Sequence, residues 1–363
     1  MGKQFQSGKK SSVSKQRIAE EIARFDPGAV GAVNGNLFGF PHDYVHASTV
    51  VIGVPWDVTT SYHDGTCLGP ETILRASPQL DFYDFDHPEA WRQGIYMLPI
   101  PDWLLAENHR LRQDAIAIIR RAEQGITPKD SSAALDRVNR GCRTMSRWVN
   151  YQTRTALAQR KKVIIVGGDH SVPLGGLGAL AQQYLSFGIL HLDAHGDLRN
   201  AYEGFQESHA SIMFNAMQLP QISKLVQVSI RDISHGEMTV IQQSNGRIVT
   251  YLDTQLKQAA YAGRGWLQQC HDIIQHLPRY VYISCDVDGL DPKLCPHTGT
   301  PVPGGLNLEE AYCLWREVVR SGRQIIGCDI CETGNHDWDG NVSARILYKL
   351  FCLMNMAGGE HDN

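Results

Sequence analysis

Apolar and polar positions alternate along this chain in blocks that predict strands and helices in turn. Short apolar runs, typical of strands buried on both faces, occur at 49–55, 94–99, 162–166, 187–192, 224–229, 247–252, 279–285 and 324–330. Stretches with the apolar spacing of a helix follow most of them. Strands that alternate with helices indicate an α/β fold with three layers, α/β/α, in which helices cover both faces of a mainly parallel sheet of roughly eight strands.

The expected helices differ in length. Two long amphipathic stretches, at about 104–125 and 131–160, separate the second strand from the third. They contain no cluster of metal-binding residues, so we interpret them as structural. Shorter helices are expected from about 70 and at 172–185, 235–244, 254–276, 307–320 and 342–356, with a Gly- and Pro-rich loop from the seventh strand to 305.

The composition changes at about residue 48. Residues 1–47 contain Lys, Ser and Gln and then Gly, Asn and Pro, with a short helix-like piece at 15–24. They form either an extension that lies along the domain or along a neighbouring subunit, or a disordered tail. Residues 48–363 contain no internal boundary and no repeat of fixed period, and we interpret them as one domain.

Charge and apolar content exclude several classes of protein. The chain is 42% apolar and carries a formal charge of −4, so it lacks the basic character of most nucleic-acid-binding proteins. We find no apolar segment long enough to span a membrane and no leader sequence. The nine cysteines are odd in number and scattered, which argues against a disulfide framework. A cytoplasmic protein with neither a nucleic-acid nor a membrane partner is expected.

Three residues with metal-binding side chains follow the apolar run 187–192 at alternate positions. They are Asp193, His195 and Asp197. An extended backbone points residues i, i+2 and i+4 to the same side. We therefore expect the three side chains to converge just beyond the end of a strand.

Two other strand ends carry matching groups: His170 follows one strand, and Asp286 and Asp288 follow another. Parallel sheets bind ligands at the carboxyl ends of their strands. A single aspartate there is usually a turn residue or a helix cap. For Asp169 we expect a turn role or a role in supporting a ligand. Several carboxylates in one cleft would repel one another unless a cation neutralised them. The six residues together therefore predict a site for two divalent metal ions.

The types of ligand narrow the choice of metal. Four carboxylates and two imidazoles without a thiolate suit Mn, Ni, Co or Fe more than a structural zinc. Two ions about 3.5 to 4 Å apart can share a bridging water and activate it near neutral pH. Hydrolysis of a planar, resonance-stabilised centre is the chemistry that such a site would support.

Two further residues are candidates for catalysis. His209 lies a few residues beyond Asp197, where it could pass protons to a leaving amine or be a surface histidine without a role. Glu332 follows the strand at 324–330, where it could pair with a guanidinium group or be a solvated loop residue. Residue chemistry alone leaves both alternatives open.

Four sequence blocks resemble, in their order, the signature motifs of the ureohydrolase family, which includes arginase and agmatinase. The blocks are Gly167–Ser171, Asp193–Asp197, Ser284–Pro292 and Thr298–Pro301. The resemblance extends from about 48 to 357 and implies a catalytic domain at 48–363 with a three-layer α/β/α fold. It also implies assembly into trimers or hexamers.

The resemblance implies roles for individual residues as well. One ion would be held by His170, Asp193, Asp197 and Asp286, and the other by Asp193, His195, Asp286 and Asp288. His209 would handle the proton, Glu332 would bind the guanidinium group, and Thr300 would lie beside Glu332. Attack on the guanidinium carbon and loss of an amine would then give urea.

Several segments resemble the guanidinase (guanidine hydrolase) branch, which the resemblance associates with nickel. They are the N-terminal extension and residues 202–205, 208–212 and 295–301. His297 stands where an Asn is expected in that branch, a departure that leaves alkylguanidines and biguanides such as metformin open besides guanidine. Bulky loop residues could close over a compact substrate: Trp56, Tyr62, His63, Tyr202, Phe205, His297 and Trp338.

The leading hypothesis is a hydrolase of a small guanidine compound with two divalent ions per chain, nickel or alternatively manganese. It would release urea or a urea-like product with ammonia or an amine, and would form a homotrimer or homohexamer. His297, Thr300, Glu332 and Trp338 are the expected substrate contacts. One alternative is an agmatinase or guanidinobutyrase that uses manganese. Another is an inactive partner subunit that assembles with a paralogous chain.

Overall fold

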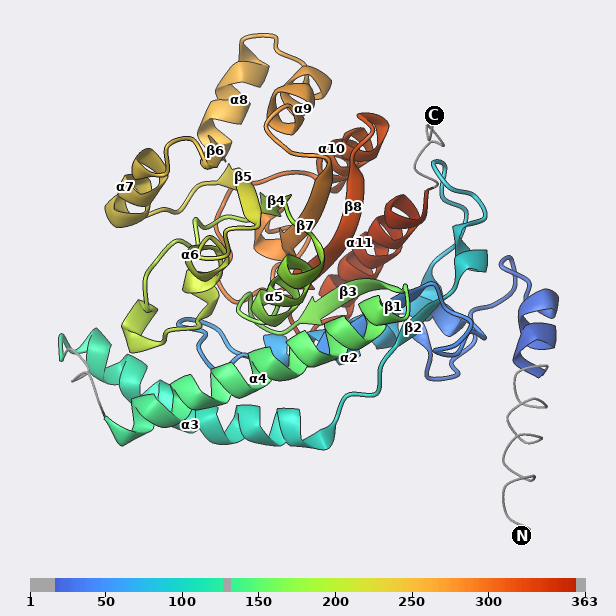
Figure 1. Ribbon diagram of the computed structural model, residues 1–363, viewed down its shortest axis with the longest axis horizontal. Coiled ribbons are helices and arrows are strands. Elements are labelled where there is room, and N and C mark those ends of the chain that lie inside the picture. The colour runs from blue at the N-terminus through green and yellow to red at the C-terminus, as the bar shows by residue number, and fades with distance from the viewer. Residues whose placement is uncertain (1–16, 127–131, 357–363) are drawn as a thin grey trace.

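Eight parallel strands form a sheet through the centre of this protein (Figure 1). The computed structural model describes residues 17–126 and 132–356. The strands are β1 (Thr49–Val54), β2 (Ile95–Met97), β3 (Lys162–Gly167), β4 (Phe187–Leu192), β5 (Ile222–Ile230), β6 (Ile248–Leu252), β7 (Tyr280–Asp286) and β8 (Gln324–Cys331), in the spatial order β2-β1-β3-β8-β7-β4-β5-β6. The predicted α/β fold with a parallel sheet of eight strands is confirmed.

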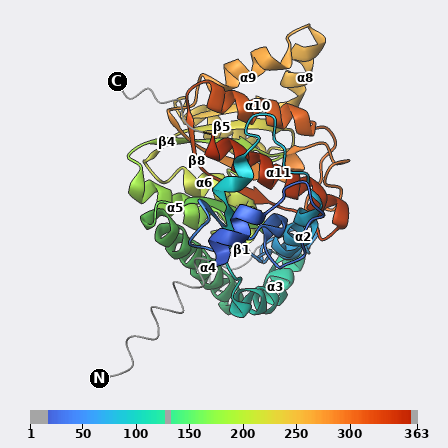
Figure 2. The same ribbon diagram turned by 90° about the vertical axis from the view of Figure 1, so that its right-hand side faces the viewer.

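Helices cover both faces of the sheet (Figures 1 and 2). One face packs against α2 (Gly69–Ala76), α9 (Trp266–Ile274), α10 (Leu308–Arg320) and α11 (Asp337–Asn355). The other packs against α3 (Asp102–Glu123), α4 (Ala133–Ala158), α5 (Leu174–Gln183) and α6 (Ile212–Ala216). Two further helices, α7 (His235–Gln243) and α8 (Asp253–Tyr261), lie next to the edge strand β6.

Because helices cover both faces of the sheet, most positions of its strands are apolar. In β3, Ile164 and Val166 belong to the apolar cluster that contains α11, whereas Val163 and Ile165 belong to the cluster that contains α3 and α4. Successive side chains of a strand point to opposite faces. A strand between two helical layers must therefore be a continuous apolar run, the pattern that predicted these strands.

The long helices α3 and α4 lie side by side along one side of the molecule (Figure 1). Both are amphipathic: each buries apolar residues along one face and carries arginine and acidic side chains on the other. Within the part of the chain that the structure describes, no helix combines the length and the apolar character needed to cross a membrane.

Part of the N-terminal segment packs into the core of the same chain. The side chains of Leu37, Phe38 and Phe40 are fully buried and join the cluster around α11. The ring of Phe40 lies 4.8 Å from that of Phe82, and the ring of Phe38 lies 5.2 Å from that of Tyr348. Aromatic contacts thus attach residues 37–40 to the domain, beside β2 and the short 3-10 helix Ser77–Gln79.

Three helix boundaries differ from the prediction or lie partly outside the described residues. The single helix expected at 254–276 is two helices, α8 and α9, separated at 262–265, where Gly263 has a φ of 87°. A left-handed glycine ends a helix by turning the chain. α11 begins at Asp337 rather than 342, because His336 accepts a hydrogen bond from the backbone of Trp338 and caps it. The piece expected at 15–24 is helical over 17–24, and residues 15 and 16 lie outside the described residues.

Candidate metal centre

The carboxyl ends of four adjacent strands bring the candidate residues together. β3, β8, β7 and β4 are neighbours in the middle of the sheet. The segments at their carboxyl ends contain His170, Glu332, Asp288 and Asp193 respectively. Carboxyl ends of parallel strands lie at one edge of a sheet, where ligands bind. Strand order, which brings the last strand next to the third, therefore assembles the site.

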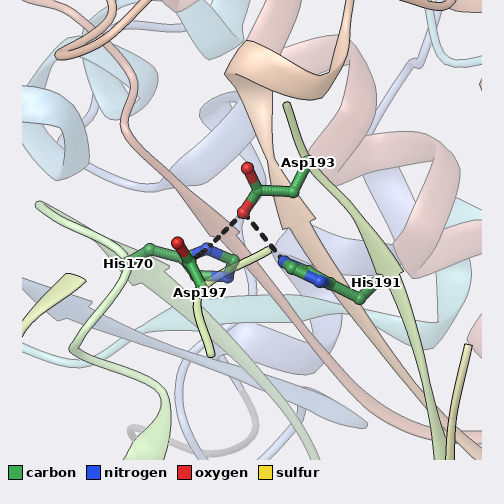
Figure 3. A group of neighbouring side chains, drawn as sticks. All are labelled: His170, His191, Asp193 and Asp197. Atoms are coloured by element: carbon green, nitrogen blue, oxygen red, sulfur yellow. Dashed lines mark hydrogen bonds and ion pairs between the residues drawn. The ribbon is translucent and has the colours of Figure 1, made fainter. Parts of the chain in front are cut away.

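His170 lies against a group of carboxylates, two of which are drawn in Figure 3. Its Nδ1 atom lies 3.0 Å from Oδ2 of Asp193, 3.1 Å from Oδ2 of Asp197 and 3.4 Å from Oδ2 of Asp286. All four side chains are buried. The residues expected to hold one ion therefore surround a common point.

A second group shares Asp193 with the first. Nδ1 of His195 lies 3.4 Å from Oδ1 of Asp193 and 3.1 Å from Oδ2 of Asp288. Asp193 thus directs Oδ2 toward His170 and Oδ1 toward His195. The side chain of His195 is 24% exposed while both carboxylates are almost fully buried, so the centre opens to solvent beside His195. The structure brings all six predicted residues together.

The segment after β4 is a turn and not an extended strand. β4 ends at Leu192, and Asp197 has a φ of 53°, in the left-handed region. Oδ1 of Asp193 accepts a hydrogen bond from the backbone N–H of His195 at 2.6 Å, a side-chain contact typical of turns. The three side chains do converge as expected. The reason given for it, alternation along an extended backbone, is wrong, because the backbone forms a turn.

The two ligand segments, 193–197 and 286–289, pack directly on each other. A Cβ atom at Gly289 would lie 2.5 Å from the backbone nitrogen of Asp193. Oδ1 of Asp288 accepts a hydrogen bond from the backbone of Ala194 at 3.0 Å, and Oδ1 of Asp286 accepts one from Asp288 at 2.9 Å. Because only glycine permits this approach, Gly289 determines how close the carboxylates of the two segments lie.

The buried carboxylates would be ionised together only beside a cation. Burial and then the charge of Asp193 raise the pKa of Asp197 to about 7. Burial and then the charge of Asp288 raise the pKa of Asp286 well above its usual range. Burial disfavours the charged form of His195, but Asp288 and Asp193 raise its pKa. Divalent ions would stabilise the ionised carboxylates, and a donor set of carboxylate oxygens and imidazole nitrogens fits them.

A row of buried polar residues crosses the sheet beneath the carboxylates, and sequence reasoning missed it. Gln227 of β5, His191 of β4, Ser284 of β7 and Asp329 of β8 are register partners on adjacent strands. All four are fully buried. The sequence does contain a signal for this row. His191 and Ser284 each precede a candidate ligand by two residues, so each faces the same side of its strand as that ligand.

This polar row orients two of the candidate ligands. Nε2 of His191 lies 2.8 Å from Oδ2 of Asp193 (Figure 3). Nε2 of His170 lies 2.9 Å from Oγ of Ser284, which itself donates to Asp329 at 2.8 Å. Since the hydroxyl proton of Ser284 is used in that bond, His170 donates from Nε2. Its Nδ1 atom, which faces the carboxylates, is then the nitrogen that a cation would bind in place of a proton.

His209 is held by Thr59, a residue that sequence reasoning also missed. The backbone N–H of His209 donates to Oγ1 of Thr59 at 3.3 Å, and Nδ1 lies 3.4 Å from the same oxygen. Thr59 donates to Asp169, whose other oxygen accepts from the backbone of Ser171, the turn role expected for it. Burial and then the charge of His195 lower the pKa of His209 to about 3. Its imidazole is therefore neutral, and Nε2 can accept a proton.

Glu332 is a buried carboxylate with one oxygen unpaired. Oε1 accepts a hydrogen bond from the backbone of His170 at 3.1 Å, whereas Oε2 has no hydrogen-bond partner within the described ranges. Burial and then the charges of Asp169 and Asp288 raise its pKa well above the usual range. Its φ of 62° is uncommon outside glycine. An unpaired buried oxygen is costly, so this position suits a cationic partner.

The segment around Thr300 borders both Asp288 and Glu332. Oγ1 of Thr300 donates to Oδ2 of Asp288 at 3.3 Å. A Cβ atom at Gly299 would lie 2.8 Å from Oε2 of Glu332, so the residue directly against that oxygen is Gly299. The backbone N–H of His63 donates to the carbonyl of Gly299 at 3.2 Å and ties the loop after β1 to this segment.

His297 and Trp338 lie near the start of α11. Nδ1 of His297 lies 2.8 Å from Oδ1 of Asp339, and its ring stacks on that of His336 with centroids 4.0 Å apart. Trp338 is half exposed, and its Nε1 donates to the carbonyl of Lys293. A role for His297 and Trp338 in substrate binding stays a prediction.

Two of the bulky loop residues lie in the core instead. Trp56 and Phe205 are fully buried in the cluster that contains α3 and α4. The expectation that they close over a substrate is wrong, because packing against the two long helices removes both rings from the surface. Tyr62 is exposed, and the ring of Tyr202 lies 6.1 Å from that of His209.

Comparisons with known proteins agree with this geometry. Residues 47–354 match the model of the arginase family. The chain is 28% identical over 316 residues to the N(1)-aminopropylagmatine ureohydrolase of Synechocystis sp., covering 85% of this chain and 89% of that protein. It is 26% identical over 316 residues to the guanidinobutyrase of Pseudomonas aeruginosa, covering 84% and 85% respectively.

A solved structure agrees with the fold. The agmatine ureohydrolase of Thermoplasma volcanium superposes with a TM-score of 0.66 at 21% identity, and the match covers 93% of this chain and 97% of that one. Because the family model spans most of the sequence and the buried carboxylate and imidazole groups fit divalent metals, this chain belongs to the arginase family, whose members are metal-dependent ureohydrolases that act on C–N bonds.

Proposed function

We propose that this protein hydrolyses a C–N bond of a small guanidine compound, such as guanidine, an alkylguanidine or a biguanide. The products would be urea or a urea-like compound and ammonia or an amine. Glu332 carries the proposal, because its unpaired buried oxygen lies beside the candidate metal centre, with Oε1 only 3.1 Å from the backbone of His170. A guanidinium group is planar and cationic and pairs well with a carboxylate.

The proposed centre contains two divalent ions. One would be held by His170, Asp193, Asp197 and Asp286, and the other by Asp193, His195, Asp286 and Asp288. Nickel is favoured and manganese is the alternative, since the donor set lacks a thiolate and the sequence resembles the guanidinase branch. When bound, the two ions would polarise a water molecule for attack on the planar carbon.

The protein groups have distinct parts in the proposed reaction. Glu332 binds the guanidinium group through its free oxygen and so orients the carbon toward the centre. His209 is neutral, and with Nδ1 directed at Thr59 its Nε2 atom accepts a proton and returns it to the leaving amine. Thr59 therefore selects the tautomer of His209 that this transfer needs.

A compact substrate is supported by the surroundings of Glu332. The backbone of Gly299 lies against Oε2, and His63 ties a second loop to Gly299. Thr300, His297 and Trp338 would complete the substrate site.

The second candidate is an agmatinase or guanidinobutyrase. The names of two relatives favour it, because these proteins act on aminopropylagmatine and on guanidinobutyrate.

The proposal extends to the organisation of the molecule. Residues 48–363 would form the catalytic domain, with 1–47 as an N-terminal extension. The chain would assemble as a homotrimer or homohexamer, with a paralogous subunit as a further arrangement. Mass measurement of the native protein tests this independently of activity.

A substrate panel tests the proposed function. The full chain, freed of metal and reconstituted with Ni²⁺ or Mn²⁺, is assayed for urea release from guanidine, methylguanidine, biguanides, guanidinobutyrate, agmatine and arginine. Asp193→Ala, which removes the carboxylate shared by both groups, is the inactive control. We expect turnover of the small guanidines in preference to the long substrates.

Each outcome has a defined meaning. Preference for agmatine or guanidinobutyrate would replace the proposal by the second candidate. Activity that requires a co-purified paralogous chain would identify an inactive partner subunit. If none of the compounds were turned over with either metal, the proposal would be wrong.

A further inference from the structure

Arg231, just beyond β5, joins three segments by hydrogen bonds. The five N–H groups of its guanidinium make seven hydrogen-bond contacts, some of which share a proton. They reach both oxygens of Ser229 and the carbonyl oxygens of Asp288, Gly289, Leu290 and Val302. The shortest, at 2.5 Å, ends on the carbonyl of Asp288. None of the seven ends on a carboxylate, although Arg231 is partly buried.

The backbone that presents Arg231 is irregular. The register between β5 and β6 shifts between Val228 and Ile230, and the intervening Ser229 has a φ of 78°. A non-glycine residue in this region is strained and persists only where its surroundings fix it. The hydroxyl of Ser229 donates to the carbonyl of Gly289 at 2.9 Å, so the irregularity itself contacts the segment that contains Asp288.

The same irregularity also contacts the other ligand segment. The backbone N–H groups of Arg231 and Asp232 both donate to the carbonyl of Ala194, at 2.8 and 3.0 Å. Ala194 lies between Asp193 and His195. The end of β5 therefore holds the 193–197 segment by its backbone and residues 288–290 by the side chain of Arg231.

We propose that Arg231 is a positioning residue that fixes Asp288 relative to Asp193 and thereby determines the affinity of the ion held by His195 and Asp288. This inference rests on the two-metal centre of the proposed function. Carbonyl oxygens from Asp288, Gly289, Leu290 and Val302 converge on one place, and without a cation among them they would repel one another. A planar group with five donors can satisfy them together, whereas an ammonium cannot.

The two ions should respond differently to the loss of Arg231, because Asp288 is a proposed ligand of only one of them. His170 and Asp197 are held by other elements, and the contacts of Arg231 do not include them. Loss of Arg231 should therefore weaken one ion and spare the other. A role in folding alone would not separate the two ions.

Metal titration tests the proposal without any substrate. Full-length wild type, Arg231→Ala and Arg231→Lys are stripped of metal and titrated with Mn²⁺ alone by calorimetry, with metal analysis after dialysis. Arg247→Ala is the matched control, because Arg247 donates to the carbonyls of Leu219 and Ile222 at the opposite end of β5. Loss of a residue that orients a metal ligand typically lowers the metal affinity about 10- to 100-fold.

We expect wild type and Arg247→Ala each to bind two ions, with dissociation constants that are similar between the two proteins. Arg231→Ala should retain the first ion and bind the second about 10- to 100-fold more weakly, with Arg231→Lys between them. If Arg231→Ala does not fold, Arg231→Lys provides the same comparison. Unchanged binding of the second ion, or equal weakening of both ions, would overturn the proposal. Because no substrate is involved, failure of the substrate panel would leave this result unaffected.

Discussion

Nε2 of His191 lies 2.8 Å from Oδ2 of Asp193, and both side chains are fully buried. Gln227 donates a hydrogen bond to Nδ1 of His191 at 3.1 Å, so the proton of the neutral ring is on Nε2, directed at the carboxylate. Burial lowers the pKa of His191, which keeps the ring neutral. A histidine outside the six predicted ligands thus fixes the orientation of the carboxylate that the two groups share.

Replacement of His191 should weaken metal binding without unfolding the protein. In His191→Leu, Asp193 loses its donor and is free to rotate, and we expect the affinity for Mn²⁺ to fall about 10- to 100-fold at both positions. Calorimetric titration of the metal-free chain measures it. His271→Leu, which removes an exposed histidine from α9, is the control. Wild-type affinity in His191→Leu would mean that Asp193 is held in place without His191.

Glu332→Gln should separate substrate binding from metal binding. The variant keeps the shape of the side chain and removes the charge opposite the guanidinium group. A hydrogen bond to a charged group contributes about 1.5 to 3 kcal/mol, which corresponds to a decrease of about 13- to 160-fold in kcat/KM. Two ions per chain should remain, as measured by metal analysis. Normal turnover would place the guanidinium contact elsewhere.

Gly299→Ala should impair the same contact by a steric route. The added Cβ atom would lie 2.8 Å from Oε2 of Glu332, closer than real Cβ contacts, so the carboxylate must move. We expect KM to rise about tenfold or more, equivalent to at least 1.4 kcal/mol of lost binding, with an unchanged metal content. Gly236→Ala is the control, because its Cβ would meet nothing closer than 4.0 Å. Equal KM values in both variants would contradict the assignment of Oε2 to the substrate.

The fold and the site differ in how far the sequence predicts them. Apolar runs predicted the parallel sheet correctly, because strands covered on both faces are apolar at most positions. Asp193, His195 and Asp197 are close in sequence, so their spacing indicated a shared site even though the backbone there is a turn. In such cases residue type and separation along the chain are sufficient.

Contacts that depend on strand order were not predictable in this way. Ser284 meets Asp329 because β8, the last strand, lies between β3 and β7. Thr59 reaches His209 across 150 positions of sequence. Trp56 and Phe205 were expected at the site because aromatic loop residues can line a pocket, but the faces of α3 and α4 bury them. Residue type alone does not distinguish those two locations.

His42 should make the stability of the protein depend on pH. Its ring is buried 5.9 Å from that of Phe40, and a Cβ atom at Gly94 would lie 2.4 Å from it. Burial lowers the pKa of His42 to about 4. The backbone of Arg92 and the charge of Asp43 oppose this shift, and His46 contributes to it. The ordinary pKa of an unfolded histidine is about 6.5.

Between pH 6.5 and 4 the unfolded chain therefore binds a proton at His42 that the folded chain does not. The full contribution of the neutral ring to the free energy of unfolding is present above pH 6.5. It decreases as the pH falls toward 4, by about 2 kcal/mol at pH 5.

The variant His42→Leu has no group at this position to protonate, so its stability should not decrease for this reason. We expect the difference in free energy of unfolding between wild type and His42→Leu to shift by about 2 kcal/mol in favour of the variant from pH 7.5 to pH 5. Urea denaturation of the metal-free proteins measures the shift, and His109→Leu, on the exposed side of α3, should produce none. Parallel pH profiles for wild type and His42→Leu would show that His42 becomes protonated without cost in the folded state.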